Sequence, residues 1–396
     1  MIRAVTESQS ATSNNRMNPK LQQQVQQVID TLVASGEEVG LQVAAYVGND
    51  LVVDAWAGIA DEATGRKVDG DTLFTSWSTT KGFVSTCVHI LAERGRLDYD
   101  APIATYWPEF AAHGKAKATV RHALTHMIGV PHMPGQVTPE MMTNWDAMCA
   151  AIAAAEPVWV PGTKAGYHAW TFGWINGEIV RRVDGRPLAQ FAREELCRPL
   201  GIRDFYLGIP GEVEPRVAPL RQDPAHLDGA LQLTGLAKQV MPPQVTSAAV
   251  INRPDVRRAS IPGGGGIMNA RAIARHYAML ACGGTLDGVC LVSPECIEIM
   301  RTPHPIMTDE IFGVPSRYGH GYALGGDSAQ GGDAVMGRSG AAFGHGGNGG
   351  SIGFADPSRR LSVGLTKNLM RAVADPSQAA AYRVAETIRQ HLDQAA

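Results

Sequence analysis

The stretch of sequence that decides the fold is Thr72-Leu73-Phe74-Thr75-Ser76-Trp77-Ser78-Thr79-Thr80-Lys81. It holds the one S-x-x-K sequence of the 396-residue chain, from Ser78 to Lys81. The residues that follow, 83–91, are apolar on nearly every side, and Gly95 ends the run. This pattern predicts a buried helix that begins near Ser78. A spacing of three residues places Ser78 and Lys81 on one face of that helix.

Serine and lysine at this spacing indicate nucleophilic chemistry. A serine hydroxyl is a weak nucleophile at neutral pH and needs a base to accept its proton. A lysine in an apolar setting has a lowered pKa and can fill that role. The free backbone N–H groups at a helix N-terminus can stabilise a developing oxyanion. The alternative is an N-capping Ser78 with an exposed Lys81, and the segment alone leaves both interpretations open.

The segment 72–81 resembles the nucleophile segment of the serine β-lactamase and penicillin-binding-protein superfamily. Within it, the branch of class C-like enzymes and family VIII carboxylesterases is most similar. Three further stretches resemble family segments in the same order: E-R-G-R-L-D-Y-D at 93–100, T-V-R-H-A-L-T-H-M-I-G-V at 119–130 and P-G-T-K-A-G-Y-H at 161–168. Together the matches span about residues 40 to 370. The resemblance implies a β-lactamase-like fold.

Tyr167 matches the tyrosine of the family's Y-x-N motif, so the resemblance implies a general base at this position. We expect this phenol to ionise below its ordinary pKa of about 10, because cationic or proton-donating groups would lie nearby. In this interpretation Tyr167, supported by Lys81, takes the proton of Ser78. The sequence departs from the family at the third motif position, where Ala169 stands in place of asparagine.

The family's Lys-Thr-Gly motif is matched here by His345-Gly346-Gly347. The resemblance implies that these three residues bind substrate and that the backbone N–H groups of Ser78 and Asn348 form the oxyanion hole. An imidazole is mostly neutral at pH 7, so the permanent cation that holds a β-lactam carboxylate is missing. This substitution favours neutral esters as substrates. Glycine residues let the strand approach a substrate closely.

Strand patterns at both ends of the chain and helices between them predict an α/β fold. We expect an antiparallel sheet from both termini, flanked by helices, with a mainly helical second portion. The predicted elements are a helix around 21–32, a hairpin of 39–47 with 51–58, a second hairpin of 319–325 with 349–356, a strand at 361–366 and a closing helix at 377–392. The predicted domains are a flexible tail (1–18), the α/β sheet domain (19–75 and 255–396) and the helical domain (76–254), with the catalytic cleft at their seam.

Composition excludes several classes of protein. Apolar residues make up 44% and charged residues 18% of the chain, which excludes wholesale disorder. A formal charge of −3 argues against nucleic-acid binding, and no apolar run reaches the roughly 18 residues of a membrane span. The polar start of the chain and six cysteines without a C-x-x-C pair predict reduced thiols and a cytoplasmic location.

Several motifs have competing interpretations. Ser351 lies in a G-x-S-x-G sequence, but the strand–elbow–helix context of an α/β-hydrolase is missing, and only Asp356 or Asp375 with His391 could complete a triad. We expect His122 and His126, four residues apart, to be structural and not metal ligands. The run 263–266 lacks the ending of a phosphate loop and predicts a close-packed turn entering a helix at the cleft floor. Candidate walls of an acyl pocket are Trp159, Trp170, Phe172 and Tyr318, with packing in the core as the alternative.

The sequence therefore predicts a serine carboxylesterase that hydrolyses small neutral acyl esters through an acyl-Ser78 intermediate, with weak β-lactam hydrolysis as a side activity. The alternatives are a β-lactamase or D-alanyl peptidase, an acyltransferase that uses the same acyl-enzyme, and a non-catalytic binding relative. We expect no metal and no organic cofactor, a small ester as the partner, and neither nucleic acid nor a membrane. Acyl chain length, stereopreference and oligomeric state are left open.

Overall fold

The computed structural model describes residues 17–373 and 375–395. The predicted tail, 1–18, lies outside the described residues up to residue 16. Its last residue, Asn18, is the N-cap of helix α1 (Pro19–Ala34), and its side chain accepts a hydrogen bond from the Leu21 N–H at 3.1 Å. The predicted helix at 21–32 is confirmed, and its end at Gly36 follows from the left-handed φ of 74° that a glycine adopts there.

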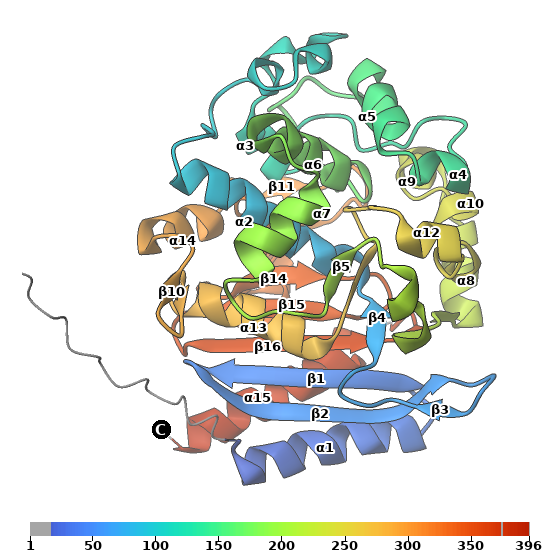
Figure 1. Ribbon diagram of the computed structural model, residues 1–396, viewed down its shortest axis with the longest axis vertical. Coiled ribbons are helices and arrows are strands. Elements are labelled where there is room, and N and C mark those ends of the chain that lie inside the picture. The colour runs from blue at the N-terminus through green and yellow to red at the C-terminus, as the bar shows by residue number, and fades with distance from the viewer. Residues whose placement is uncertain (1–16, 374, 396) are drawn as a thin grey trace, which may run out of the picture.

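The two ends of the chain build one antiparallel sheet of seven strands in the order β13-β14-β15-β16-β1-β2-β3 (Figure 1). The predicted hairpin of β1 (Gly40–Val47) and β2 (Asp50–Asp61) is confirmed. Strand β16 (Leu361–Lys367) pairs with β1, so that Leu41 lies opposite Lys367. The expected sheet from both termini is therefore present. The remaining strands are β3 (Arg66–Lys67), β13 (Ala323–Leu324), β14 (Phe343–Gly346) and β15 (Ile352–Asp356).

The predicted hairpin of 319–325 with 349–356 is wrong. Strand β14 lies between β13 and β15, and Gly346 of β14 pairs with Ile352 of β15. Strand β13 is only two residues long, because the glycine-rich stretch before it forms a turn in which Gly321, with a φ of 88°, donates its N–H to the Leu124 carbonyl. The alternating glycines of 319–321 therefore form a turn where the sequence predicts a strand.

Helices cover both faces of the sheet (Figure 1). On one face, α1 and the closing helix α15 (Ala380–Ala395) share a core of aliphatic side chains with β1 and β2. On the other face lies α13 (Ala270–Ala281), which packs so closely that a Cβ on Gly353 would stand 2.3 Å from the Tyr277 ring. Glycine at this strand position is what allows the helix to approach.

A second, four-stranded sheet carries the nucleophile segment. Its order is β5-β8-β4-β6, with β4 (Leu73–Thr75) leading directly into Ser78. Helix α2 (Thr80–Glu93) follows, is buried from residue 80 to 91 and packs against α6 (Thr171–Asp184). The other strands are β5 (Phe205–Leu207), β6 (Val217–Ala218), β7 (Arg221–Gln222), β8 (Gly266–Met268), β9 (Thr285–Leu286), β10 (Val289–Cys290), β11 (Met307–Thr308), β12 (Pro315–Ser316) and β17 (Leu369–Met370).

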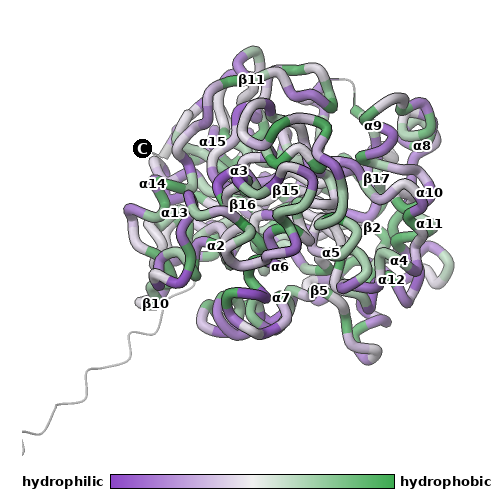
Figure 2. Tube along the Cα trace, turned by 90° about the horizontal axis from the view of Figure 1, so that it is seen from above, coloured by the Kyte–Doolittle hydropathy of each residue, from purple (hydrophilic) through white to green (hydrophobic). Residues whose placement is uncertain are grey.

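Further short helices lie between residues 120 and 301. They are α3 (Val120–Leu124), α4 (Pro139–Met142), α5 (Trp145–Ala154), α7 (Leu188–Phe191), α8 (Pro224–Leu231), α9 (Gly235–Val240), α10 (Pro243–Thr246), α11 (Ala248–Ile251), α12 (Pro254–Arg258) and α14 (Pro294–Arg301). Seen from above and coloured by hydropathy, α8 and α9 lie at the periphery and carry hydrophobic residues there (Figure 2). Across the part of the chain that the structure describes, no helix has the length and apolar character to span a bilayer.

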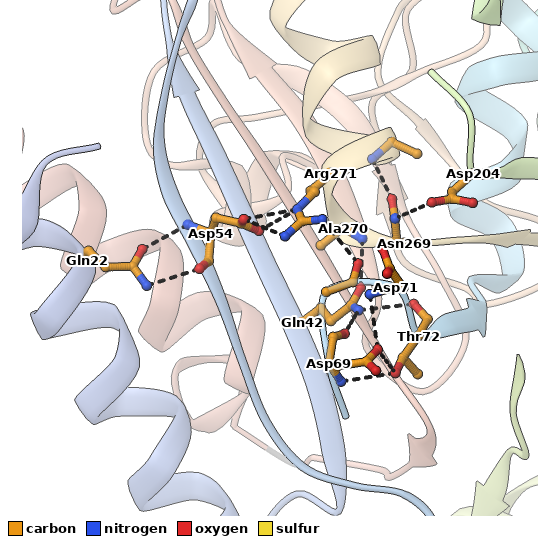
Figure 3. A network of polar contacts seen from close by, with 12 residues as sticks. Gln22, Gln42, Asp54, Asp69, Asp71, Thr72, Asp204, Asn269, Ala270 and Arg271 are labelled. Atoms are coloured by element: carbon orange, nitrogen blue, oxygen red, sulfur yellow. Dashed lines mark hydrogen bonds and ion pairs between the residues drawn. The ribbon is translucent and has the colours of Figure 1, made fainter. Parts of the chain in front are cut away.

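A polar network joins the two sheets and fixes the start of the nucleophile segment (Figure 3). Gln42 of β1 is only 3% exposed, and its amide nitrogen donates to the carbonyls of Asp69 and Thr72 at 2.5 and 3.0 Å. Its amide oxygen accepts from the Ala270 N–H at the start of α13, at 3.1 Å. Both the nitrogen and the oxygen of this buried amide are therefore hydrogen-bonded. The side chain is a fixed link from β1 to the residues that lead into β4 and to the start of α13.

Candidate active site

Ser78 sits in a tight turn between β4 and α2. The turn is a 3₁₀ helix at Trp77–Thr79, so α2 itself begins two residues after the nucleophile candidate, slightly later than predicted. Trp77 has a left-handed φ of 48°, a conformation that costs a bulky residue of order 1 kcal/mol. Packing holds it there: Trp77 is 3% exposed, and its ring lies 5.9 Å from that of Trp170.

Lys81 is fully buried directly beneath Ser78. Its Nζ lies 2.9 Å from Ser78 Oγ, 2.7 Å from the Ala169 carbonyl oxygen and 2.6 Å from the Gly263 carbonyl oxygen. Burial lowers the pKa of the Lys81 amine well below its ordinary value. A neutral amine has two N–H groups and one lone pair. Nζ stands as the donor to Ser78 Oγ and to both carbonyl oxygens; once the amine is neutral, the carbonyl oxygens, which can only accept, take its two N–H groups, and the lone pair is left for the Ser78 hydroxyl.

Tyr167 lies beside this pair. Its ring centre is 5.0 Å from Lys81 Nζ, and its backbone N–H donates to Asp309 Oδ2 at 2.9 Å. The expected lowering of its pKa is wrong: burial raises the pKa of Tyr167 above its ordinary value, although a hydrogen bond with Ser78 acts in the opposite direction. The physical reason is that a buried phenolate would lose its hydration, and the nearby Asp309 carboxylate raises the pKa further. The phenol therefore carries its proton in the resting protein.

The loop between β14 and β15 forms the opposite wall. Its Gly347 N–H donates to the Ser351 carbonyl at 2.7 Å, and its Gly350 N–H donates to the Gly347 carbonyl at 3.0 Å. In the described chain, the backbone N–H groups of Ser78 and Asn348 donate to no backbone carbonyl, and both residues line the same cavity. Two N–H donors without a backbone partner, facing the same cavity from opposite walls, suit an oxyanion.

His345 does not line that cavity, contrary to the sequence prediction. Its side chain is 5% exposed and packs in the interior, with its ring 6.1 Å from that of Tyr167. Burial lowers the pKa of His345 to about 3, and its Nδ1 lies 2.7 Å from the Gly346 carbonyl. Because a carbonyl only accepts, this neutral ring is protonated on Nδ1. The cavity wall at this point is formed by Gly346 and Gly347 instead.

The cavity has a volume of about 440 Å³. Within the described residues, no lysine, arginine, aspartate or glutamate lines it. Of the four predicted aromatic walls, only Trp170 lines the cavity, because the other three rings pack elsewhere: Phe172 against Lys81, Tyr318 against His126 and Trp159 against His168. The lining residues are Trp77, Ser78, Tyr167, Ala169, Trp170, Ala225, His226, Gly229, Ala230, Leu233, Met241, Thr246, Gly263, Gly264, Phe312, Gly346, Gly347, Asn348 and Ala372.

Sequence reasoning missed the wall contributed by residues 225–246, by Phe312 and by Ala372. The segment 225–246 carries small residues and isolated apolar ones and has no periodic apolar face of the kind that marks a core helix. Helix α8 in this segment has no buried residue among those described. The only available signal was the position of these loops between matched family segments.

The competing interpretations of Ser351 and the histidines are resolved by their hydrogen bonds. Ser351 is 3% exposed and its Oγ donates to the Ser76 carbonyl at 2.8 Å, while His391 lies on α15, bonded to Gln24 of α1 at 2.7 Å. The hydroxyl and this histidine therefore belong to different layers, and no triad forms. His122 accepts from the Thr119 N–H in a capping box at the start of α3.

The glycine run 263–266 forms a close-packed turn at the cavity floor, as predicted. A Cβ on Gly263 would stand 2.5 Å from the Trp170 carbonyl oxygen, and its own carbonyl accepts from Lys81. The turn enters strand β8 first and helix α13 only afterwards, because Gly266 already pairs in the four-stranded sheet.

A serine and a buried lysine at the start of a central helix, beside an antiparallel sheet built from both termini, define a β-lactamase-like serine protein. Residues 25–387 match the Beta-lactamase family, and the chain belongs to this family. It is 34% identical over 343 residues to Esterase/beta-lactamase LipL of Mycobacterium tuberculosis, covering 83% of this chain and 77% of that one.

Solved structures agree over almost the whole chain. A family VIII carboxylesterase is 35% identical, with a TM-score of 0.86 and coverage of 95% of this chain and 98% of that one. A penicillin-binding-protein homologue from Caulobacter crescentus is 32% identical, with a TM-score of 0.83 and the same coverage of both chains. EstA from Arthrobacter nitroguajacolicus is 26% identical, with a TM-score of 0.80 and coverage of 94% and 96%. The predicted fold and family resemblance are confirmed.

Proposed function

We propose that this protein is a serine carboxylesterase that hydrolyses small neutral esters through an acyl-Ser78 intermediate. The observation that carries the proposal is the 2.9 Å contact between Ser78 Oγ and Lys81 Nζ at a cavity that no charged side chain of the described chain lines. The names of two similar proteins, a family VIII carboxylesterase and Esterase/beta-lactamase LipL, support the same reaction class.

The first half-reaction transfers the acyl group to Ser78. The lone pair of neutral Lys81 takes the Ser78 proton as Oγ attacks the ester carbonyl carbon. The carbonyl oxygen becomes an oxyanion, which accepts from the backbone N–H groups of Ser78 and Asn348. When the C–O bond breaks, the departing alkoxide takes the phenol proton of Tyr167, and Tyr167 recovers a proton from the Lys81 ammonium.

The second half-reaction removes the acyl group with water. Neutral Lys81 again accepts a proton, now through Tyr167, as water attacks the acyl carbonyl. The new C–O bond replaces the bond to Ser78 Oγ, which recovers its proton. In this scheme Tyr167 acts as a proton relay that begins protonated, which follows from its raised pKa. This role of Tyr167 differs from that of the phenolate base that the sequence predicted.

The uncharged lining disfavours a β-lactamase or D-alanyl peptidase as the main activity, because their substrates carry a carboxylate that needs a cation. Weak β-lactam hydrolysis stays a proposed side activity, supported by the name of the LipL relative. We also propose that the sheet portion (19–75 and 255–396) and the helical portion (76–254) act as the two sides of the cleft. A cytoplasmic location stays a prediction, supported by six cysteines that all carry free thiols.

Hydrolysis of p-nitrophenyl butyrate beside nitrocefin tests the proposal, with wild type, Ser78→Ala and Ser351→Ala. We expect strong ester turnover that Ser78→Ala abolishes and Ser351→Ala retains, with nitrocefin turnover far lower. Dominant nitrocefin turnover would contradict the argument from the uncharged cavity. Loss of ester turnover in Ser351→Ala alone would contradict the assignment of Ser78 as the nucleophile.

A further inference from the structure

Helix α8 forms one wall of the cavity but is weakly attached to the protein. Its inner residues, among them His226, line the cavity, while Leu227 and Leu231 are 38% and 55% exposed. None of its described residues is buried. A helix without a buried face gains little from packing, so its position depends on specific polar contacts.

His226 supplies those contacts. Among the described residues of α8, it is the only one whose side chain hydrogen bonds to the protein outside the helix. Its Nδ1 lies 3.2 Å from Gln222 Nε2, and its Nε2 lies 2.8 Å from Asn348 Oδ1. It therefore stands between strand β7 and the loop that carries the proposed oxyanion donor.

The direction of each hydrogen bond between Gln222, His226 and Asn348 follows from the contact that Gln222 makes with Ala248. The Ala248 N–H donates to Gln222 Oε1 at 3.2 Å, which orients the amide so that its NH₂ group faces His226. His226 Nδ1 must then accept, and a neutral ring that accepts on Nδ1 carries its proton on Nε2. That Nε2–H donates to Asn348 Oδ1, which can only accept. All three side chains are thus in a single, consistent arrangement.

Asn348 is the one residue between Gly346 and Gly350 that has a side chain. The next two residues, Gly349 and Gly350, have left-handed φ values of 86° and 108°, so glycine is needed there and the backbone of this loop is intrinsically flexible. The Asn348 carboxamide is therefore the only side-chain group within the loop through which its backbone N–H can be held in place.

We propose that His226 is a positioning residue that fixes the Asn348 loop, and with it the oxyanion donor, through the Gln222–His226–Asn348 relay. The relay also links the wall of the cavity formed by α8 to the loop that carries the proposed oxyanion donor. The kinetic part of this inference rests on the proposed function.

Two substitutions of His226 distinguish the contribution of its Nε2 from that of its Nδ1. The amide nitrogen of His226→Gln can take the place of Nε2 and donate to Asn348, whereas the shorter His226→Asn reaches only the place of Nδ1. Leu227→Ala, an exposed position on the same helix that does not line the cavity, is the matched control. With p-nitrophenyl butyrate we expect kcat to fall about tenfold in His226→Asn at nearly unchanged KM, to recover largely in His226→Gln and to stay at wild-type level in Leu227→Ala.

A double-mutant cycle with Asn348→Ala tests whether the two residues act as one unit. Asn348→Ala keeps the backbone N–H but removes its support, so the double variant with His226→Asn should be no slower than either single variant. A roughly hundredfold fall in the double variant would mean that the two effects add, that His226 acts on substrate independently, and that the relay is wrong.

Amide hydrogen exchange provides a readout that does not depend on activity. The Gly347 and Gly350 N–H groups are bonded within the loop, and His226→Asn should speed their exchange while Leu227→Ala and His226→Gln should not. Unchanged exchange in His226→Asn would overturn the inference even in an active esterase. Faster exchange in a protein without ester turnover would support the relay while the proposed function fails.

Discussion

Replacing Lys81 by methionine tests the neutral-amine reasoning directly. Methionine keeps the length and volume of the buried side chain but removes its nitrogen. We expect kcat/KM for p-nitrophenyl butyrate to fall by about 10²–10⁴, the range that a positioned general base contributes. Lys81→Arg should lose a comparable amount, because a guanidinium keeps a positive charge but cannot accept a proton at neutral pH.

The stability effect follows from the contacts of Lys81. Its removal leaves the Ala169 and Gly263 carbonyls without their partner, at a cost of about 1–3 kcal/mol each, partly offset by burying a thioether in place of an amine. A net loss of about 2–4 kcal/mol in the free energy of unfolding is expected near pH 10, where the neutral amine of the folded chain costs least relative to the unfolded one. Urea denaturation, followed by circular dichroism, measures it.

The pH dependence of the stability lost in Lys81→Met shows whether Lys81 is charged or neutral in the folded protein. Burial lowers the pKa of Lys81, so the unfolded chain binds more protons than the folded one between the folded pKa and about 10.5. In that window the wild-type free energy of unfolding gains up to about 1.4 kcal/mol per pH unit from this residue, and Lys81→Met does not. The difference between the two proteins should therefore grow as pH rises.

Two results would refute this reasoning. If Lys81→Met retained a tenth or more of the wild-type kcat/KM, the base would lie elsewhere. If the stability difference between wild type and Lys81→Met were independent of pH up to 10, Lys81 would be charged in the folded protein, and its lone pair could not face Ser78.

Three further substitutions have expected outcomes that thermal and urea unfolding can check beside ester turnover. Ser351→Ala removes the bond to the Ser76 carbonyl and should cost about 1 kcal/mol with turnover retained; loss of all turnover would contradict its structural role. Gly347→Ala would place a Cβ 2.5 Å from that same carbonyl oxygen, so turnover should fall at least tenfold; wild-type turnover would mean that the loop is not close-packed. Glu38→Gln breaks the buried ion pair with Lys367 and should cost about 3–5 kcal/mol; a change below 1 kcal/mol would show the pair to be solvated.

The contact between Ser78 and Lys81 could be predicted from sequence because it depends on local geometry. A spacing of three residues in a run of apolar positions places Ser78 and Lys81 together whatever the rest of the chain does. The two terminal strand patterns likewise predicted the main sheet, since each alternates or is continuously apolar over a full strand length.

Other features depend on contacts between distant segments. The raised pKa of Tyr167 arises from burial of its ring and from the nearby Asp309 carboxylate, and neither is visible in the local sequence. Helix α8 has no buried residue to mark it, so its role as a cavity wall could not be predicted. The interior position of His345 depends in the same way on the packing around β14.

The pairing of β1 with β16 limits the order in which the parts of the protein can fold during synthesis. Residues that pair across this junction, such as Val43 and Leu365, are more than three hundred positions apart in the chain. During synthesis, the hairpin of β1 and β2 and helix α2 leave the ribosome long before β16 does, so one edge of β1 has no partner until residue 367 has emerged. The loop between β14 and β15, which carries Asn348, also follows α2 by more than two hundred residues. The nascent chain therefore holds Ser78 and Lys81 without the opposite wall of the cavity, and it must keep an apolar strand edge from aggregating until β16 is made.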